Sequence, residues 1–600
     1  MKWLPPLLAF AALAGGAYCL LGLRQRLYEE SGGLRQEVAH GGSTTTRRAQ
    51  TPDLRKNSLP PQTQRVTYEG WIWIPAAGKY VFATHMKGEV NLRIHGRLLI
   101  RDKSRPTRAQ GHRSPLTHQR RLKKRQILLP SGWVRLHLHY RPPKNDPAGL
   151  RLLWQPPGRR GDPEYVHPTF FRAQKQKPSQ PGPQGLPLAD AFIATALLAL
   201  LLMVGVVAFR APLRTWGRRL ARDGSYRAKW AVALALFISA AAVRLFDLGG
   251  AGQTWDEDVY FGAGRNYLQN LLALDFAEES WIWNYEHPPF SKYLIGWASL
   301  WTESMNGPRA LSAVFSSLAI PAAFLAGVRL VGFWPALIGG LLAVFSPHLI
   351  GHSKIAAHES PSVALFTLCA AAYLASSAAP WRTSGETNQD SSPRGGRLRA
   401  ALEAPLPPTR NPNALLLLSG ILGGLALSTR WLNGGALFLL ILWAVLDLRP
   451  QMKRGRSSLE IRWGALLIPA LFFVVLGVSW PRLWSHPVAK MAETFGHYPA
   501  ALQVTEFFLG QRTSPPPHYF LTYFSAVIPA ACLVGWALFF VAWVFSSSKA
   551  RRGHLRLFLW WLVPMAMGLA GPMKQDGIRY VLPALVPAAL MSGVGAWWLV

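Results

Sequence analysis

Long apolar runs alternate with polar stretches along most of this 600-residue chain. The first run covers residues 1–23, the second covers 188–209 and the third begins at Trp230. More apolar runs follow towards the end of the chain. Each run is long enough to cross about 30 Å of hydrocarbon as a helix. The pattern therefore predicts a polytopic α-helical membrane protein.

A different pattern occupies residues 65–173, between the first two apolar runs. Short β-rich stretches alternate there with Gly, Pro and Asn, and they read "GWIWIP", "GKYVFAT", "VNLRIHGRLLI", "WVRLHLHY" and "LRLLWQPPG". This spacing is typical of an antiparallel β-sandwich. In "WVRLHLHY" we expect Val134, Leu136 and Leu138 to face the core, and the residues between them to face water.

The polar segments divide the chain further. Residues 24–64 are rich in Ser, Thr, Arg and Gln, which is typical of a flexible linker. The predicted order is an anchor at 1–23, the linker at 24–64, the sandwich at 65–173, a second linker at 174–187, a second transmembrane helix at 188–209, a basic loop at 210–229 and a multi-span helical region at 230–600.

The formal charge of +35 accompanies a chain that is 50% hydrophobic and only 16% charged. Basic residues of polytopic proteins gather in cytoplasmic loops, so this charge does not call for a nucleic-acid partner. The loop at 210–229 holds seven basic residues and one acidic residue, which predicts that it is cytoplasmic. The sandwich then lies outside the cytoplasm, and the third span carries the chain out to "TWDEDVY".

Asp256 and Glu257 in "TWDEDVY" are the candidate catalytic carboxylates. Neighbouring residues point in different directions, so only one can face a small site, while the other orients the loop, binds a metal or meets solvent. Arg244 and Asp247 lie three apart near the end of the preceding apolar run and are spaced to pair. Charges inside a membrane are functional by default. The alternative is a pair that snorkels to the interface.

His287 precedes two prolines in "EHPPF". Two prolines cannot continue a helix and hold the residue before them extended. We therefore expect His287 to lie in a rigid, extended segment that leads into the next helix. A second group of histidines follows, with His348 and His352 four apart and with His358 and Glu359 beyond them. Histidines four apart supply part of a zinc site, but no compact ligand motif is present. The cofactor is left open, with a divalent metal ion as one alternative.

Several of these segments resemble motifs of the protein O-mannosyltransferases, glycosyltransferase family 39. "DEDVY" resembles the Asp-Glu motif of that family, and "NYEHPPFSKYLIG" resembles its His-Pro-Pro segment. "GGLALSTRWLNGGALF" resembles its Ser-x-Lys-Trp segment, with Arg430 in place of the usual Lys. "DGIRYVLPALVPAAL" is similar to the bacterial lipid A aminoarabinose transferases. The resemblance covers about residues 241–600.

The resemblance implies a large membrane glycosyltransferase of the GT-C fold at 230–600. It implies transfer of a hexose or pentose from a polyprenyl-phosphate-linked donor to a hydroxyl of a protein, lipid or glycan acceptor. This reaction would take place on the outer face of the cell inner membrane. Asp256 would be the base of an inverting displacement, with Glu257 beside it. The candidates for binding the donor and its phosphate are Arg244, His287, Lys292, Lys354, Arg430 and Arg579. The alternative interpretation is that the basic side chains among them only extend to the membrane interface.

Residues 68–173 resemble the protective-antigen-type lectin-like domain, through "GWIWIPAAGKYVF", "NLRIHGRLLI", "LPSGWVRLHLHY" and "GLRLLWQPPG". The resemblance implies binding of a glycan or an anionic surface. The turn "THMKGEV" lacks the paired aspartates that hold calcium in some members, so calcium-dependent binding is not expected. Residues 101–125 hold ten Lys or Arg, which suit anionic headgroups or an acidic glycan. The alternative for this run is a solvated loop.

Two other function classes stay open. A transporter of lipid-linked sugars is opposed by the gathering of charge at the outer rim and by the lack of paired broken helices at matching positions. A membrane-anchored glycan-binding protein without catalysis is opposed by Asp256 and the three motifs that accompany it. The sugar, the acceptor and the oligomeric state are not specified by these patterns. The chain stops inside the apolar run "GAWWLV", so a further segment beyond Val600 is an open alternative.

Overall fold

The computed structural model divides the chain into two compact units. The first comprises Met1–Val207, Thr254–Asn284 and Ile295–Ser304, and the second comprises Ala208–Gln253, Tyr285–Leu294 and Met305–Val600. The structure describes residues 4–31, 33–54, 59–60, 62–103, 123–143, 149–157, 163–166, 170–174, 186–250, 252–302, 304–377, 399, 402–404, 406, 411–448, 450–453, 456–459, 463–496, 505–571 and 574–600. Most of the basic run at 101–125 and of the linker at 174–187 lies outside the described residues.

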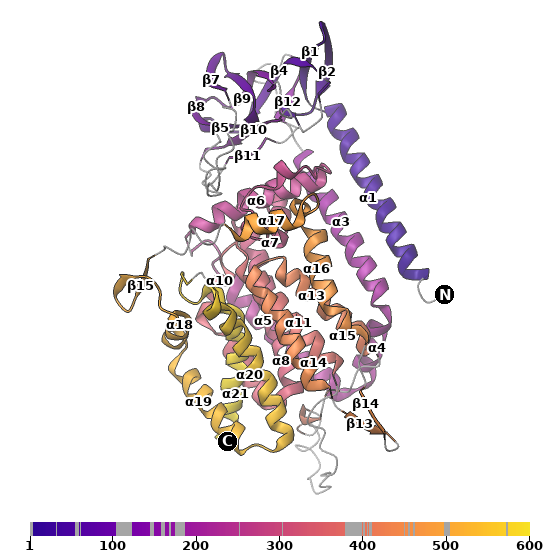
Figure 1. Cartoon of the computed structure of the whole chain (residues 1–600), viewed down its shortest axis with the longest axis vertical. Coiled ribbons are helices and arrows are strands. Elements are labelled where there is room, and N and C mark those ends of the chain that lie inside the picture. Colours follow the sequence, from indigo (N-terminus) through magenta and orange to yellow (C-terminus); the bar gives the residue numbers. More distant parts are fainter. Residues whose placement is uncertain are drawn as a thin grey trace. The chain divides into compact units, whose positions relative to one another are not determined.

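A β-sandwich forms much of the first unit (Figure 1). One sheet has the order β2-β1-β4-β9-β6-β7, with β12 beside β4, and the other has the order β11-β10-β5-β8, with β3 beside β10. The described pairings are antiparallel. The strands are β1 (Leu34–His40), β2 (Ser43–Ala49), β3 (Asp53–Leu54), β4 (Thr63–Ile74), β5 (Gly78–Lys87), β6 (Glu89–Ile94), β7 (Arg97–Lys103), β8 (Lys123–Leu129), β9 (Gly132–Arg141), β10 (Gly149–Gln155), β11 (Glu164–Tyr165) and β12 (Phe171–Arg172).

The two sheets share one apolar core. Tyr68 and Leu136 from the first sheet and Phe82 and Trp154 from the second belong to the same buried cluster. Along β9 the residues Val134, Leu136 and Leu138 are buried while Arg135 is exposed, as alternation along a strand requires. The predicted antiparallel sandwich and its inward face are confirmed.

The prediction of a flexible linker over residues 24–64 is wrong. Strands β1 and β2 lie within it and pair with each other, and β1 also pairs with β4. Leu34 and Val38 of β1 are buried in the sandwich core. The inward face of β1 thus belongs to the sandwich core, although the segment is polar on average.

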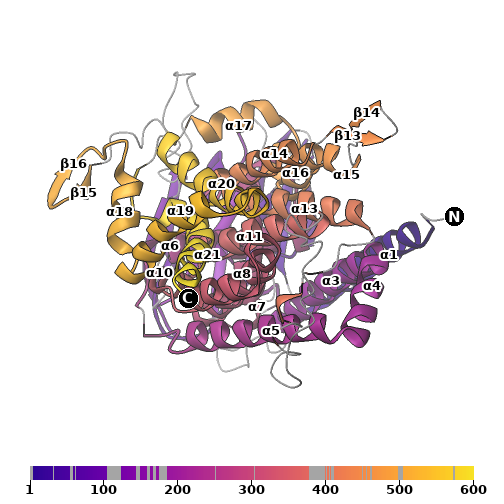
Figure 2. The same ribbon diagram turned by 90° about the horizontal axis from the view of Figure 1, so that it is seen from below.

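Helices complete the first unit. Helix α1 (Leu4–Ser31) lies beside α3 (Leu186–Ala208), as Figures 1 and 2 both show. Their apolar side chains pack with those of α6 (Trp255–Leu272), which precedes the short helix η2 (Glu278–Trp281). Arg24 of α1 donates to Asp190 of α3 over 2.7 Å, and both side chains are buried. The helix α7 (Phe290–Trp301) is divided between the two units.

The second unit is helical. Helix α8 packs against α5, α9 and α11, and α21 packs against α9 and α19. A Cβ at Gly593 of α21 would clash with the Pro335 carbonyl of α9, so this approach requires glycine. The helices are α4 (Arg210–Arg222), α5 (Gly224–Leu245), α8 (Asn306–Val331), α9 (Phe333–Val344), α10 (Pro347–Ser353), α11 (Glu359–Ser376), α13 (Pro412–Leu427), η3 (Trp431–Gly434), α14 (Gly435–Asp447), α15 (Trp463–Leu466), α16 (Ile468–Ser479), η4 (Pro481–Leu483), α17 (Pro487–Phe495), α18 (Tyr519–Val527), α19 (Ala530–Phe545), α20 (Ser548–Ala570), η6 (Arg579–Ala584) and α21 (Leu585–Trp598). Two small hairpins pair β13 (Pro450–Lys453) with β14 (Arg456–Leu459), and β15 (Glu506–Phe508) with β16 (Gln511–Thr513).

Several described helices are long and apolar enough to cross a membrane. Four are single spans, at Leu188–Ala208, Gly224–Leu245, Asn306–Val331 and Arg579–Trp598. Two bent pairs, α9 with α10 and α18 with α19, raise the number to six if each pair is one span. These helices and the inserted sandwich confirm the predicted class, a polytopic helical membrane protein with an antiparallel β domain.

The sandwich core gives a first prediction. Leu136→Ala should lower the stability of the sandwich by about 2–5 kcal/mol, because it leaves a cavity at a fully buried position. Arg135→Ala, on the opposite face of the same strand, is the matched control. Limited proteolysis of the full-length protein in detergent should cleave the sandwich of the Leu136 variant much faster. Equal cleavage of the two variants would show that this face is not the core.

Candidate active site

The acidic motif forms the start of α6. Thr254 is the N-cap, and the carboxylate of Glu257 accepts a hydrogen bond from the Thr254 backbone N–H over 2.9 Å. This is the back-bonding half of a capping box, which satisfies an N–H group at the helix start. Glu257 is fully buried, whereas Asp256 is half-buried. Glu257 therefore holds the first turn of the helix that carries Asp256.

Arg244 supports the end of another helix. Its guanidinium group is fully buried and donates to the carbonyl oxygens of Ala343 and Val344, over 3.1 and 3.0 Å. These carbonyls belong to the last turn of α9, where backbone acceptors lack helical partners. The predicted pairing with Asp247 is wrong, because α5 ends at Leu245 and the Asp247 carboxylate instead accepts from the Gly250 N–H.

A buried ion cluster surrounds Glu359 in the second unit. The Oε1 atom of Glu359 pairs with the Nε atom of Arg579, and it lies 3.9 Å from Nη1 of Arg430. The Nε2 atom of His358 lies 3.3 Å from the same oxygen. Glu359 is the first residue of α11, Arg579 begins η6, and Arg430 directly precedes η3. Three segments that are distant in sequence therefore meet at one carboxylate.

Arg430 is held on two sides. Its Nη1 atom donates to the backbone carbonyl of Arg579 over 3.1 Å, and its guanidinium carbon lies 4.0 Å from the ring centre of Tyr580. A guanidinium group over an aromatic face is attracted by the ring quadrupole. The neighbouring Trp431 donates from its indole N–H to the Glu286 carbonyl over 3.0 Å. This bond ties the Arg430 segment to "EHPPF".

His287 and Lys292 belong to the same region. The His287 ring centre lies 4.8 Å from that of His358, and the Lys292 ammonium group donates to the His287 carbonyl over 2.7 Å. Of the predicted donor-binding residues, the structure thus places His287, Lys292, Arg430 and Arg579 near one another. Lys354 lies elsewhere, with its ammonium group 6.0 Å from the ring centre of Phe246.

Burial and neighbouring cations affect the two histidines. The pKa values of His287 and His358 lie well below the usual range. Burial is the largest cause, and the positive charge of Arg430 lowers them further. Both imidazoles are therefore neutral at neutral pH. Neutral rings can lie in contact without repulsion, which is consistent with their close approach.

Within the described residues, no group of three or more His, Cys, Asp or Glu side chains could hold a metal ion. The sequence offers His348, His352, His358 and Glu359 as metal candidates. The last two belong to the ion cluster, where the Glu359 carboxylate already carries guanidinium partners. These residues do not fit a metal site.

An apolar cavity of about 520 Å³ adjoins the cluster. Arg430, His287 and Tyr580 contribute to its lining. Apolar side chains make up most of the rest, among them Leu427, Leu437, Phe438, Phe472, Leu476 and Met567. The arrangement suits a ligand with a long hydrocarbon part and one anionic group.

Comparisons with known proteins find partial likenesses only. No protein-family model matches the chain, and no curated protein matches it. ArnT from Cupriavidus metallidurans bound to undecaprenyl phosphate is 16% identical over 60% of this chain and 59% of that chain, with a TM-score of 0.40. The archaeal oligosaccharyltransferase AglB from Archaeoglobus fulgidus, in complex with an inhibitory peptide and a dolichol-phosphate, is 12% identical over 62% of this chain and 50% of that chain, with a TM-score of 0.40. An anti-sigma factor domain-containing protein from Clostridium clariflavum is 18% identical over 26% of this chain and 50% of that chain, with a TM-score of 0.19. The chain spans less than two thirds of each of these proteins.

The sequence interpretation missed the part that Glu359 plays. It treated Glu359 only as a metal candidate, whereas the carboxylate is the common partner of two arginines. The sequence does indicate this role, because Glu359 is the first residue of an apolar helix, and a carboxylate can be buried there only if it is paired with a cation. Tyr580, which stacks on Arg430, was not predicted at all.

The buried histidines give a second prediction, on pH. Below about pH 6.5 the unfolded chain binds protons at these histidines and the folded chain does not, so stability falls as the pH falls, by up to about 1.4 kcal/mol per unit for each histidine. His358→Gln should reduce this loss, measured as the drop in melting temperature between about pH 6.5 and about pH 5. The exposed His486→Gln variant should retain the full drop. An unchanged pH slope in the His358 variant would contradict its neutral state.

Proposed function

We propose that this protein transfers a sugar from a polyprenyl-phosphate-linked donor to a hydroxyl group of a protein, lipid or glycan acceptor. The observation that carries the proposal is the apolar cavity with Arg430 in its wall, next to Arg579 and Glu359. A polyprenyl chain requires an apolar environment, and its phosphate requires a fixed cation. The motif resemblance to protein O-mannosyltransferases supports the same donor class.

The charge of the cluster suits the leaving group. Arg579 pairs with both Glu359 and Asp576, whereas Arg430 lies 3.9 Å from Glu359 and lines the cavity, so the positive charge of Arg430 is the less neutralised of the two. The donor phosphate carries one negative charge, and a second develops as its bond to the sugar breaks. Fixed cations stabilise such charge most where water is excluded. Arg430 is already oriented by the Tyr580 ring and the Arg579 carbonyl, so little reorganisation accompanies the reaction.

The displacement needs one base. The acceptor oxygen attacks the anomeric carbon, the bond from that carbon to the phosphate oxygen breaks, and polyprenyl phosphate leaves with the electron pair. The acceptor proton passes to Asp256, the residue that the family resemblance implies, on the first turn of α6. One carboxylate is sufficient for an inverting displacement, because phosphate is a good leaving group without an acid. His287 and Lys292 position the donor.

The reaction is proposed for the outer face of the cell inner membrane. The helix α4, which contains five arginines and no buried residue, lies between the candidate spans α3 and α5. Such arginine-rich connections stay in the cytoplasm. The chain then emerges on the other face after α5, just before Asp256. The sandwich lies between α1 and α3 in the sequence, and we place it on that outer face as well.

Arg430 gives the third prediction. Arg430→Gln should lower transfer by about 10²- to 10³-fold, because it removes a cation that stabilises the developing phosphate charge. Arg430→Lys should recover much of the activity, since it keeps the charge. The exposed Arg552→Gln on α20 is the matched control. The assay supplies labelled undecaprenyl-phosphate mannose, glucose or aminoarabinose to membranes and measures label in glycoconjugates. Wild-type transfer by Arg430→Gln would refute the role of this residue.

Asp256 gives the fourth prediction. Asp256→Asn should lower transfer by about 10²- to 10⁴-fold, the usual contribution of a general base. Asp258→Asn, two positions further along the same helix turn, should retain activity. Transfer that survives in the Asp256 variant would exclude Asp256 as the base. No transfer by the wild-type protein from any donor would favour glycan binding without catalysis, and passage of a lipid-linked sugar alone would favour transport.

A further inference from the structure

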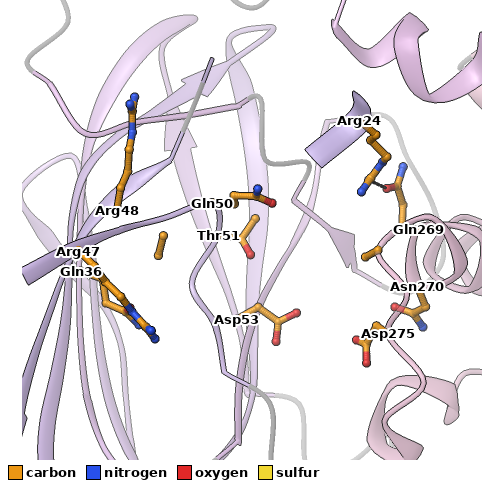
Figure 3. A pocket seen from close by; sticks show the side chains of 12 residues that line it. Arg24, Gln36, Arg47, Arg48, Gln50, Thr51, Asp53, Gln269, Asn270 and Asp275 are labelled. Atoms are coloured by element: carbon orange, nitrogen blue, oxygen red, sulfur yellow. Dashed lines mark hydrogen bonds between the residues drawn. The ribbon is translucent and has the colours of Figure 1, made fainter. Parts of the chain in front are cut away.

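A second, polar pocket lies within the first unit. It has a volume of about 280 Å³, and its lining comes from α1, from β1, from β2 and the segment that leads into β3, and from the end of α6 and the turn after it. Figure 3 shows Gln50 and Asp53 of the sandwich on one side and Gln269 and Asp275 of the helical segment on the other. None of these residues belongs to the ion cluster around Glu359.

Buried ion pairs hold the walls of this pocket. Arg151 of β10 contacts Asp275 over 2.9 Å and Asp53 over 3.3 Å, and so joins the two sides. Arg24 is paired with Asp190 and also donates to the Gln269 side-chain oxygen over 3.0 Å. Arg151 and Asp275 are both buried. The lining is thus arranged before any ligand arrives, which reduces the entropic cost of binding.

Hydrogen-bonding capacity remains in the lining. Within the described residues, the Gln50 amide makes no hydrogen bond, and Figure 3 shows that it points towards the side of the pocket that carries Gln269. Asn270 donates from its amide nitrogen to the Ser280 carbonyl over 2.6 Å, which leaves its amide oxygen as an acceptor. Arg48 also belongs to the lining, at the sheet edge. The pocket therefore offers donors and acceptors together.

This mixture selects the ligand class. Asp53 and Asp275 are paired with Arg151, and Arg24 is paired with Asp190, so a ligand would meet mainly the amides of the lining. A sugar hydroxyl donates and accepts at the same time, so it can use amides, carboxylates and guanidinium groups in one site. The volume lies just below the roughly 300 Å³ at which pockets for drug-sized ligands begin. We propose that this pocket binds one neutral sugar unit of a glycan.

The position of the pocket separates it from the transfer step. Gln269 follows Asp256 by 13 positions on α6, which corresponds to about 20 Å along a helix axis. A sugar held beside Gln269 is therefore out of reach of Asp256. Binding here does not require a lipid-linked donor, so this inference does not depend on the proposed transfer. If both hold, the pocket retains a glycan whose other end accepts the new sugar.

The test measures saccharide binding by the full-length protein in detergent. Saturation-transfer difference NMR would use three probes, the methyl glycosides of mannose, galactose and N-acetylglucosamine, with inorganic phosphate as the anionic alternative. The variant Arg48→Ala/Gln50→Ala alters the pocket without touching its buried ion pairs. The control Arg125→Ala/Gln126→Ala changes two exposed residues of β8, in the other sheet.

We expect at least one glycoside to give a signal that falls about fivefold or more in the pocket variant and is unchanged in the control, as loss of two hydrogen-bonding side chains predicts. The Arg430→Gln variant should keep the signal, which separates this site from the donor cavity. Absence of any glycoside signal, an equal signal in the pocket variant, or a response to phosphate alone would each overturn the inference. If the wild-type protein binds a glycoside but transfers no sugar from any donor, that result would count only against the proposed transfer reaction.

Discussion

The Glu359 carboxylate imposes the strongest constraint on the helical unit. It is buried, and a buried carboxylate is tolerated only when cations and hydrogen bonds replace water. Its partners come from the residue before η3 and from the start of η6, so these segments must return to the start of α11. Because Trp431 then reaches the Glu286 carbonyl, the "EHPPF" turn is fixed by the same constraint. One ionised group thus assembles most of the candidate donor site.

The two arginines are not equivalent within this cluster. Arg579 makes the direct pair with Glu359, whereas Arg430 is 3.9 Å away and is oriented by a ring and a carbonyl instead. Arg430 also lines the apolar cavity, and Arg579 is absent from its lining. Glu359 therefore neutralises mainly Arg579, and the charge of Arg430 is the one that a phosphate in the cavity would meet. The ion pair of Arg579 and the cation proposed to bind the phosphate can therefore share one cluster without competing.

Local patterns allowed several features to be predicted from the sequence. The β-sandwich was predictable because its strands alternate, and β9 buries every second residue from Val134 to Leu138. The apolar spans were predictable because α3 and α5 follow their hydrophobic runs. The two motifs with Arg430 and His287 were found through resemblance, and the structure places them together. The hydrogen-bond partners of side chains are harder to predict. Arg244 donates to carbonyls at the end of α9 and does not pair with the nearby Asp247, and nothing local in the sequence indicates this.

The N-terminal segment shows why long-range pairing cannot be read from composition. Residues 24–64 look like a solvated linker, yet Arg24 is buried against Asp190, which lies 166 positions away. Neither charge could be buried alone, so the pair requires α1 and α3 to lie together. The same Arg24 reaches Gln269 of α6, and Arg151 ties β10 to Asp275 after that helix. The first helix is thus more than an anchor, because its pairing, together with that of Arg151, joins the sandwich to the helix that carries Asp256.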